Sequence, residues 1–341
     1  MWRRIKKGAA NDSRTGLSID NSRVAFATAQ PGKHDSIQLT ASVFDEGAPN
    51  SKRAQQLASR MSSVSSKSPV TSVLPENSYE VLLIEVPNVP DNEVNDAARW
   101  IIKDQIDMPV DEMVVEMFKL PKQSTADGKA MGYAVVSRRS SIKQHIELVK
   151  GSGLALDVID IPEMCTRNIA TLLPQDQYGV AFLHFTQSHG ILTVTRRGVL
   201  YLLRRIEKGR SAIDAASSGE FAAADLDHTS ELDILRAPDE VDPLAGDFSR
   251  AGLVRNIVQE IQRSLDFYDT HYNCEPLNEL VLSPGSNIGG LAKSLNETLG
   301  LAVSSLNLNR LFEMKTELSS HEQSACMLAI GAALRSEAKA A

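Results

Sequence analysis

With 341 residues, 42% hydrophobic and 23% charged, the chain has the composition of a globular protein and can bury two ordinary cores. A net charge of -7 argues against general nucleic-acid binding, which needs a basic face. The three cysteines lie far apart, so they predict neither a zinc site nor a disulfide framework. No apolar run approaches the roughly 18 residues of a membrane-spanning helix, and we expect a soluble protein of the reduced cytoplasm.

Residues 1–14 begin the chain with an aromatic residue among cations and are expected to form a flexible N-terminus. Trp2, Arg3 and Arg4 are candidates for contact with an anionic membrane surface, because each basic residue near such a surface contributes about 1 kcal/mol. The alternative is an ordinary solvated terminus.

Two stretches of the chain have the same strand pattern. Three β-type runs separated by short polar turns occur at Thr15–Asp20, Arg23–Ala29 and Ser36–Phe44, and again at Val180–Thr186, Ile191–Arg196 and Val199–Ile206. β-Branched and aromatic residues fill these runs, which is typical of antiparallel meanders. Helix and strand signals follow each meander, so the sequence predicts two related α/β halves.

Between the meanders, a helix within Pro49–Ser68 and a strand at Val70–Leu74 are expected. The stretch Tyr79–Ser137 then predicts a β-α-β-β subdomain. Its parts are a strand at Tyr79–Pro87, a helix with Asp91 as N-cap, and strands at Met113–Leu120 and Met131–Ser137. A helix at Ser140–Lys150, a strand at Leu154–Ile161 and a helix opened by Pro162 lead to the central meander.

Beyond Gly209 the periodicity is lost, and nine acidic residues with one arginine between Glu220 and Asp247 predict a mobile acidic loop at about 217–249. The expected elements that follow are helices at Arg250–Tyr272, Gly289–Leu299 and Glu322–Leu334 and strands at Glu279–Leu282 and Leu301–Ser304. A strand, a glycine-containing loop and a helix in this order often face a phosphate or a nucleotide.

At this point the pattern resembles a known family. The run Tyr79–Pro121 has a strand ending in proline, a helix carrying Trp100, a turn at Pro109–Asp111 and a strand ending in Leu-Pro. This run is similar to the PilM type of actin-like pilus assembly proteins, and within them to the branch that serves MSHA pili. Leu200–Gly209, Glu260–Tyr268 and Leu280–Gly285 match in order and spacing, so the resemblance covers about residues 15–335.

The resemblance implies an α/β fold of two actin-like, ribonuclease-H-like lobes with mixed sheets. Lobe one is expected at 15–175, with the β-α-β-β subdomain inserted at about 79–138, and lobe two at 176–337.

The resemblance also implies where a nucleotide would lie. Actin-like ATPases place an Asp-x-Gly turn in each meander, where the acid holds Mg²⁺ and the glycine admits the phosphates. The residues at the matching positions form a degenerate site: Asp20, Asn21, Ser22, Glu260, Arg263, Ser264, Pro284, Gly285, Ser286 and Asn287. Ser22 replaces the first glycine, and Leu183–Thr186 lacks both the acid and the glycine.

For Asp20 an Asx-type turn, and for Glu260, Arg263 and Ser264 a solvated helix face, are the favoured readings. We therefore expect no catalytic residues, no metal site and no enzymatic activity, with weak ATP–Mg binding left as an alternative. His184 and His189 are expected to be structural. Four arginines of the central meander form either a solvated face or a docking surface for an acidic segment: Arg196, Arg197, Arg204 and Arg205.

By resemblance, the protein is expected to be a non-enzymatic scaffold at the inner face of the inner membrane. It would bind the cytoplasmic segment of a bitopic membrane partner and other platform or motor components of a type IV pilus machine, with peripheral membrane association and no nucleic acid. An actin-like ATPase or nucleotide-gated switch is the second hypothesis. A cytoplasmic component like GspL of type II secretion is the third, although that kind carries a transmembrane segment that this sequence does not show.

Overall fold

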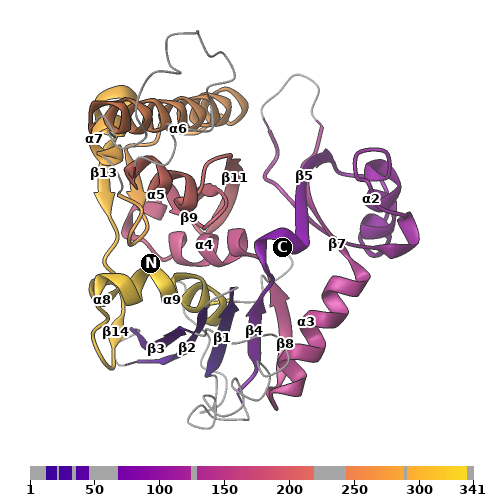
Figure 1. The fold of residues 1–341 in the computed structure, drawn as a ribbon. Helices are drawn as coiled ribbons and strands as arrows, with labels where there is room; N and C mark the ends of the chain where they lie inside the picture. Colours follow the sequence, from indigo (N-terminus) through magenta and orange to yellow (C-terminus); the bar gives the residue numbers. More distant parts are fainter. Residues whose placement is uncertain are drawn as a thin grey trace, which may run out of the picture.

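The computed structural model describes residues 13–20, 23–32, 36–45, 68–123, 129–218, 243–287 and 290–335. Two mixed sheets lie on either side of a central pair of helices, and a third, smaller sheet lies beside them (Figure 1).

The first sheet contains the first meander. Its strands are β1 (Arg14–Ile19), β2 (Arg23–Pro31), β3 (Ile37–Asp45), β4 (Val70–Val73), β8 (Leu156–Asp160) and the short β14 (Glu313–Met314). They lie in the order β14-β3-β2-β1-β4-β8, with β1, β2 and β3 antiparallel and β4 and β8 parallel to β1. The predicted meander is confirmed to within two residues at each strand end.

The second sheet repeats this plan. Its strands are β9 (Val180–Phe185), β10 (Gly190–Arg196), β11 (Val199–Ile206), β12 (Glu279–Leu282) and β13 (Ala302–Ser305). The order β11-β10-β9-β12-β13 matches β3-β2-β1-β4-β8 strand for strand, including the two parallel additions. Two sheets with the same order of directions in one chain confirm the predicted duplication and its ribonuclease-H-like topology.

Two helices fill the space between the sheets. They are α4 (Pro162–Ala170) and α9 (Ser320–Ala333), and together with both sheets they bury one apolar cluster. Two glycines permit the close packing: a Cβ on Gly331 would lie 2.3 Å from the carbonyl oxygen of Cys165 in α4, and one on Gly16 would lie 1.9 Å from that of Ala329. A capping box between Ser319 and Glu322 fixes the start of α9.

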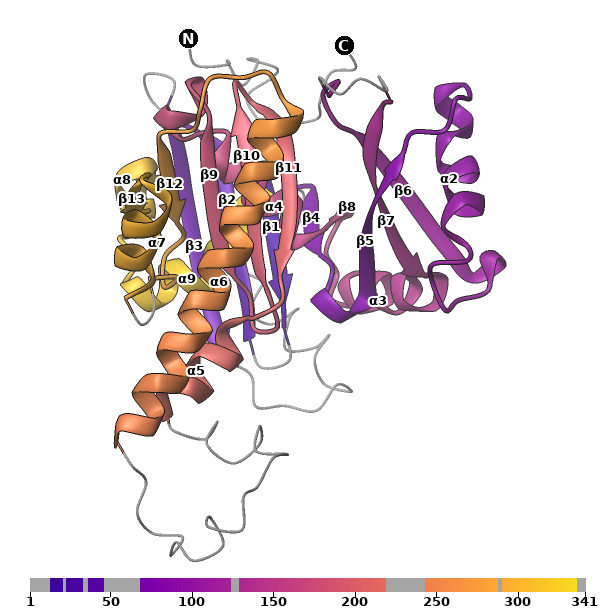
Figure 2. The same cartoon turned by 90° about the horizontal axis from the view of Figure 1, so that it is seen from above.

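The inserted subdomain lies between β4 and β8 in the chain. It contains a short 3-10 turn η2 (Glu76–Ser78), then β5 (Tyr79–Glu85), α2 (Val94–Ile102), β6 (Met113–Lys119) and β7 (Met131–Arg138), with sheet order β5-β7-β6. The helix α3 (Arg139–Gly151) returns the chain to β8. The β-α-β-β prediction is therefore confirmed. Figure 2 shows this subdomain beside the two larger sheets, with α2 on its outer side.

The inserted sheet packs α2 on one face and the second large sheet on the other. Val81, Phe118 and Tyr133 contact Ile191 and Leu203 of β10 and β11 in one apolar cluster. The hydroxyl of buried Tyr133 donates to the carbonyl of Leu203 and accepts its N–H, so it satisfies backbone groups on the outer side of the edge strand β11.

Helices cover the outer face of the second sheet. They are α5 (Arg210–Ser218), α6 (Pro243–His271) and α7 (Leu291–Leu299). Ile257, Ile261, Leu265 and Tyr268 of α6 recur at helical spacing and bury the apolar side that the periodicity predicts.

Two details of the prediction were wrong, and two short elements were missed. Asp91 is not an N-cap: the residue before α2 is Glu93, which makes no capping hydrogen bond, and the Asp91 carboxylate pairs with Lys119 on β6. The acidic loop was drawn too wide, since α5 extends to Ser218 and α6 begins at Pro243. The helix α8 (Leu308–Leu311) and the strand β14 had no periodic signal because they are too short to show one. The expected helix in Pro49–Ser68 and most of the acidic loop lie outside the described residues.

Candidate functional site

The two hairpin turns that would face a nucleotide are built alike. In the first, Asp20 Oδ1 accepts the backbone N–H of Arg23 at 2.7 Å, and the N–H of Asp20 donates to the Arg23 carbonyl at 3.0 Å. In the second, Thr186 Oγ1 accepts the N–H of His189 at 3.2 Å, and the N–H of Thr186 donates to the His189 carbonyl at 2.9 Å. Thr186 is therefore the structural counterpart of Asp20, and the side-chain oxygen of each closes its own turn.

Other predicted residues of this region cannot be placed. Asn21 and Ser22 lie outside the described residues, as do the membrane-contact candidates Trp2, Arg3 and Arg4. Their proposed roles stay predictions.

The loop after β12 is tied inward by a buried chain of polar side chains. Ser283 Oγ lies 2.8 Å from Nδ1 of His184 and 2.7 Å from Oγ of Ser286, and Ser286 Oγ accepts the N–H of Phe185 at 3.3 Å. Burial, with help from the charge of Arg210, lowers the pKa of His184 to about 3, so this imidazole is neutral at physiological pH. The predicted site residue Ser286 therefore fastens the loop to β9.

The remaining residues of that loop shape its turn. Gly285 has φ of +75°, a conformation that glycine adopts without strain, and Pro284 before it is buried. The side-chain oxygen of Asn287 accepts the N–H of Ala292 in α7 at 3.3 Å. Gly285 and Asn287 are exposed at this end of the sheet.

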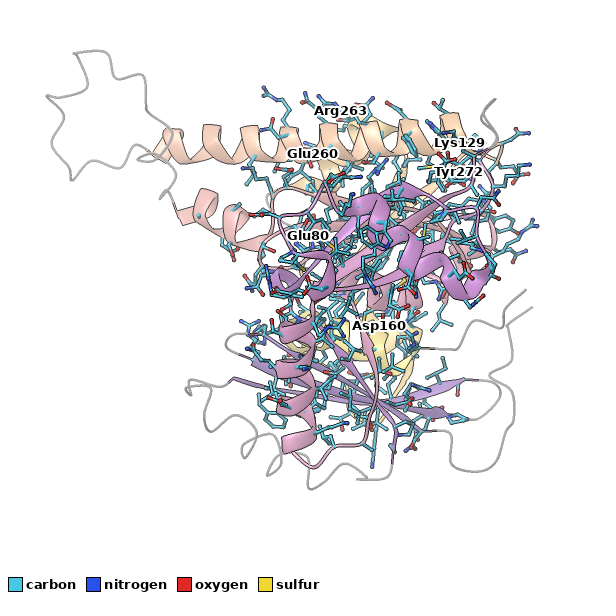
Figure 3. The ribbon with its side chains drawn as sticks, turned by 90° about the vertical axis from the view of Figure 1, so that its right-hand side faces the viewer. Glu80, Lys129, Asp160, Glu260, Arg263 and Tyr272 are labelled. Atoms are coloured by element: carbon cyan, nitrogen blue, oxygen red, sulfur yellow. The ribbon has the colours of Figure 1, made fainter. Side chains whose placement is uncertain are left out.

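The three predicted site residues of α6, Glu260, Arg263 and Ser264, differ in their contacts. Ser264 Oγ donates to the Glu260 carbonyl at 2.7 Å within the helix, and a Glu260 carboxylate oxygen accepts the N–H of Glu207, just after β11, at 3.2 Å. Arg263 is exposed, and Figure 3 shows it on the outer side of α6 with Glu260 below it, toward the body of the protein.

Arg210 is a residue of this region that the sequence did not single out. It begins α5, directly after the second meander, and its guanidinium donates to Ser324 Oγ of α9 at 3.0 Å. A Cβ on Gly285 would lie 3.3 Å from the same guanidinium. Burial lowers its pKa, and the charge of Arg23 acts in the same direction, against Asp214. Arg210 thus bridges the second half to α9, which packs on the first sheet. The sequence did contain one signal for Arg210: it directly follows Gly209, where the second meander ends and a helix begins.

A carboxylate from the inserted subdomain occupies the β9–β10 turn. Glu76 Oε2 accepts the backbone N–H of Ser188 at 3.3 Å and also its hydroxyl, and it lies 3.5 Å from Nδ1 of His189. Burial and the charge of Arg205 lower the pKa of His189, although Glu76 and Glu163 act to raise it. A backbone N–H of the kind that would face a phosphate is therefore already bound by an anionic side chain.

Behind this turn lies a buried ion pair. The side chain of Glu163 on α4 is fully buried; it accepts the Tyr79 hydroxyl at 2.6 Å and lies 2.7 Å from Arg205 of β11. The guanidinium of Arg205 also lies over the Tyr79 ring, 4.8 Å from its centroid. Burial and then the Glu163 charge raise the pKa of Tyr79 well above its ordinary value. The pair joins α4, the inserted subdomain and the second sheet.

The arginines expected to form a basic rim are largely held by other groups. Arg205 pairs with Glu163, Arg196 is buried and donates to the Glu275 carbonyl, and Arg204 stacks on the Phe267 ring. Among the four, Arg197 is the exposed residue of the β10–β11 turn. A docking surface made of all four is therefore wrong.

Within the described ranges, no three histidine, cysteine or acidic side chains converge as a metal site would require. No helix in the described part of the chain is long and apolar enough to span a membrane.

Comparisons with known proteins identify the fold. No family model matches the chain, and no curated protein matches it. Among solved structures, it resembles the PilM–PilN type IV pilus biogenesis complex with a TM-score of 0.68 and 20% identity, over 94% of this chain and 97% of the other.

Two weaker matches are the cytoplasmic domain of EpsL from the Vibrio cholerae type II secretion system and a Bacteroides thetaiotaomicron protein of actin-like ATPase fold. The first has a TM-score of 0.42 and 9% identity, over 92% of this chain and 94% of the other. The second has a TM-score of 0.46 and 10% identity, over 92% and 96%. With the duplicated sheets, the PilM–PilN likeness shows that the chain has two actin-like lobes, the second of which has β9–β13 as its sheet.

Proposed function

We propose that this chain is a non-enzymatic assembly component of a type IV pilus machine, most like the MSHA-pilus biogenesis protein MshI. In this role it works at the cytoplasmic face of the inner membrane. It binds the cytoplasmic segment of a bitopic membrane protein and brings other platform or motor components to it.

The observation that carries the non-enzymatic part is how the nucleotide-facing turns are used. Thr186 stands where the second turn would need an acid, and the carboxylate of Glu76 binds the Ser188 N–H. Arg210 crosses to α9 beside Gly285. The Thr186 side chain, the Ser188 N–H and the Arg210 guanidinium therefore each have a partner within the described part of the chain.

The docking part is supported by the fold. The chain has the shape of a protein solved in a pilus biogenesis complex, along nearly the full length of both chains. A body with two lobes and an inserted subdomain offers surfaces to partners whether or not it hydrolyses ATP.

A binding measurement with defined peptides tests the proposal. The purified chain is titrated with fluorescent peptides of the cytoplasmic segments of the bitopic pilus proteins from the same system, and with the matching segment from type II secretion. We expect saturable binding to one pilus peptide without nucleotide, and none to its scrambled version. Binding to none contradicts the scaffold role, and binding to the secretion peptide alone favours the GspL-like hypothesis.

The nucleotide-gated switch is the second candidate, and one observation favours it. The backbone N–H of Arg210 donates to the carbonyl of Thr186 in the second turn at 2.8 Å, and the charge of Arg23, at the end of the first turn, helps to lower the pKa of Arg210. Positive charges near both turns attract phosphate even where metal ligands are lost. Under this hypothesis the pilus peptide binds only when Mg-ATP is present, which the same titration measures.

A further inference from the structure

The outer face of α2 exposes apolar side chains at an unusual concentration. Five large hydrophobic residues are exposed in the described part of the chain, and three of them belong to one short segment of the inserted subdomain. They are Val89, Trp100 and Ile101, with Trp100 62% and Ile101 45% exposed. Val94, Ala98 and Ile102 bury the inner face of α2, whereas Trp100 and Ile101 leave much of their surface to solvent. A solvent-facing tryptophan beside an isoleucine is typical of an interaction surface.

The charges around this apolar pair are mostly negative. Residues 91–111 carry six exposed acidic side chains and two basic ones, a net charge of -4, or -3 with Lys119, which pairs with Asp91. The acids are Asp91, Glu93, Asp96, Asp104, Asp107 and Asp111. Asp96 lies four residues before Trp100 on α2, and Asp104 lies just beyond the end of the helix. Arg99 already pairs with Asp96, at 3.2 Å.

Lys103, the other basic residue, lies against the indole ring of Trp100. The ammonium group of Lys103 lies over the Trp100 ring, 5.7 Å from its centroid. Such a contact is weak at an exposed site and stronger when a partner excludes water. A lysine or arginine from another chain can make the same contact.

We propose that the outer face of α2 is a docking site for a basic, apolar peptide segment of a partner protein, in which leucine or aromatic side chains alternate with lysines or arginines. The apolar residues cover Trp100 and Ile101, and the cations pair with the flanking acids. This site is separate from the two hairpin turns described above and does not depend on the assignment to pili.

The negative charge of the outer face of α2 argues against an anionic membrane or a second copy of the chain as its occupant. An anionic membrane attracts polybasic segments and repels a surface with net negative charge. A second copy that used the same face would bring two such negative surfaces together, which like-charge repulsion disfavours.

Fluorescence of Trp100 tests the proposal directly. The chain contains two tryptophans, so Trp2→Phe leaves Trp100 as the reporter. The probes are two tryptophan-free peptides with the same leucines and phenylalanine, one carrying lysines and the other glutamates. We expect the lysine peptide to shift the emission of Trp100 to the blue, with an affinity that falls as salt is added, and the glutamate peptide to cause no shift.

Matched variants separate docking from folding. Ile101→Ser should weaken binding of the lysine peptide about tenfold. Tyr178→Ser removes another exposed aromatic side chain, on a different element, and should leave the affinity unchanged. Both side chains are exposed, so cooperative thermal unfolding should show that each variant is folded. Equal binding of both peptides, a normal affinity in Ile101→Ser, or a blue shift on anionic phosphatidylglycerol vesicles would overturn the proposal.

Discussion

Replacing Glu163 by glutamine tests whether the buried ion pair holds α4, the inserted subdomain and the second sheet together. Glutamine keeps the volume and an oxygen that accepts the Tyr79 hydroxyl, but it removes the charge opposite Arg205. The perturbation is therefore electrostatic and leaves the packing intact.

The expected loss follows from burial. Removing one partner of a buried pair costs about 3–5 kcal/mol, because the other charge is left without compensation. The side chain of Glu163 is fully buried but that of Arg205 is 31% exposed, so water recovers part of the loss and we expect about 3 kcal/mol. With an unfolding entropy of about 2.1 cal/mol/K per residue, 341 residues give about 0.7 kcal/mol per kelvin, and the melting temperature should fall by about 4 °C.

Urea unfolding and calorimetry measure this change, and a surface pair provides the control. Glu112 pairs with Arg138, with both side chains more than 40% exposed, so Glu112→Gln should cost no more than about 1 kcal/mol. Equal effects of Glu163→Gln and Glu112→Gln would refute the reasoning.

Three further perturbations have definite expected outcomes. Gly331→Ala should destabilise the protein by about 1–3 kcal/mol, because the new Cβ would lie 2.3 Å from the α4 backbone. Gly252→Ala, in open space on α6, should instead raise the melting temperature. The same effect in both variants would contradict the close packing of α9 on α4. Tyr133→Phe leaves the Leu203 N–H and carbonyl without their partner and should cost about 1–3 kcal/mol in urea unfolding, against no change for exposed Tyr178→Phe. The pKa of His184 is about 3 in the folded protein and ordinarily 6.5, so between these pH values the unfolded chain binds more protons than the folded one. The free energy of unfolding should therefore be highest above pH 6.5 and fall as the pH drops toward 3, and it should fall less steeply in His184→Gln. An equal slope in that variant would show that other groups cause the loss.

The duplication could be predicted because meanders carry local signals. Alternating apolar residues and tight turns mark β1 to β3 and β9 to β11, and a strand ending at a proline marks β5. Sheet order could not be predicted from such signals: the parallel pairing of β12 with β9 joins residues about a hundred positions apart. The repeated meander and the family resemblance indicated two ribonuclease-H-like sheets, and the structure supplies their strand order.

Helix ends were predicted less well where a charged stretch contains too few apolar residues to show a helical periodicity. α6 begins at Pro243, inside a stretch whose acidic composition is typical of a loop, and its first turns carry few of the large apolar residues that reveal a helix. Pro243 at the first helical position is the signal that was available.

The contacts of Glu76 and Arg210 could be predicted least. Glu76 and Ser188 are 112 residues apart, and Arg210 and Ser324 are 114 apart, so nothing local joins them. Asp20 was correctly expected to close a turn, because Asp-Asn-Ser is turn chemistry wherever it occurs.

The central claim is that the chain's own side chains hold the nucleotide-facing groups, and thermal unfolding with millimolar Mg-ATP tests it most directly. A ligand present at 100 times its Kd adds about 2.7 kcal/mol, which for this chain is a rise of about 4 °C in the melting temperature. We predict no rise. An increase of that size that requires both ATP and Mg²⁺ would contradict the account.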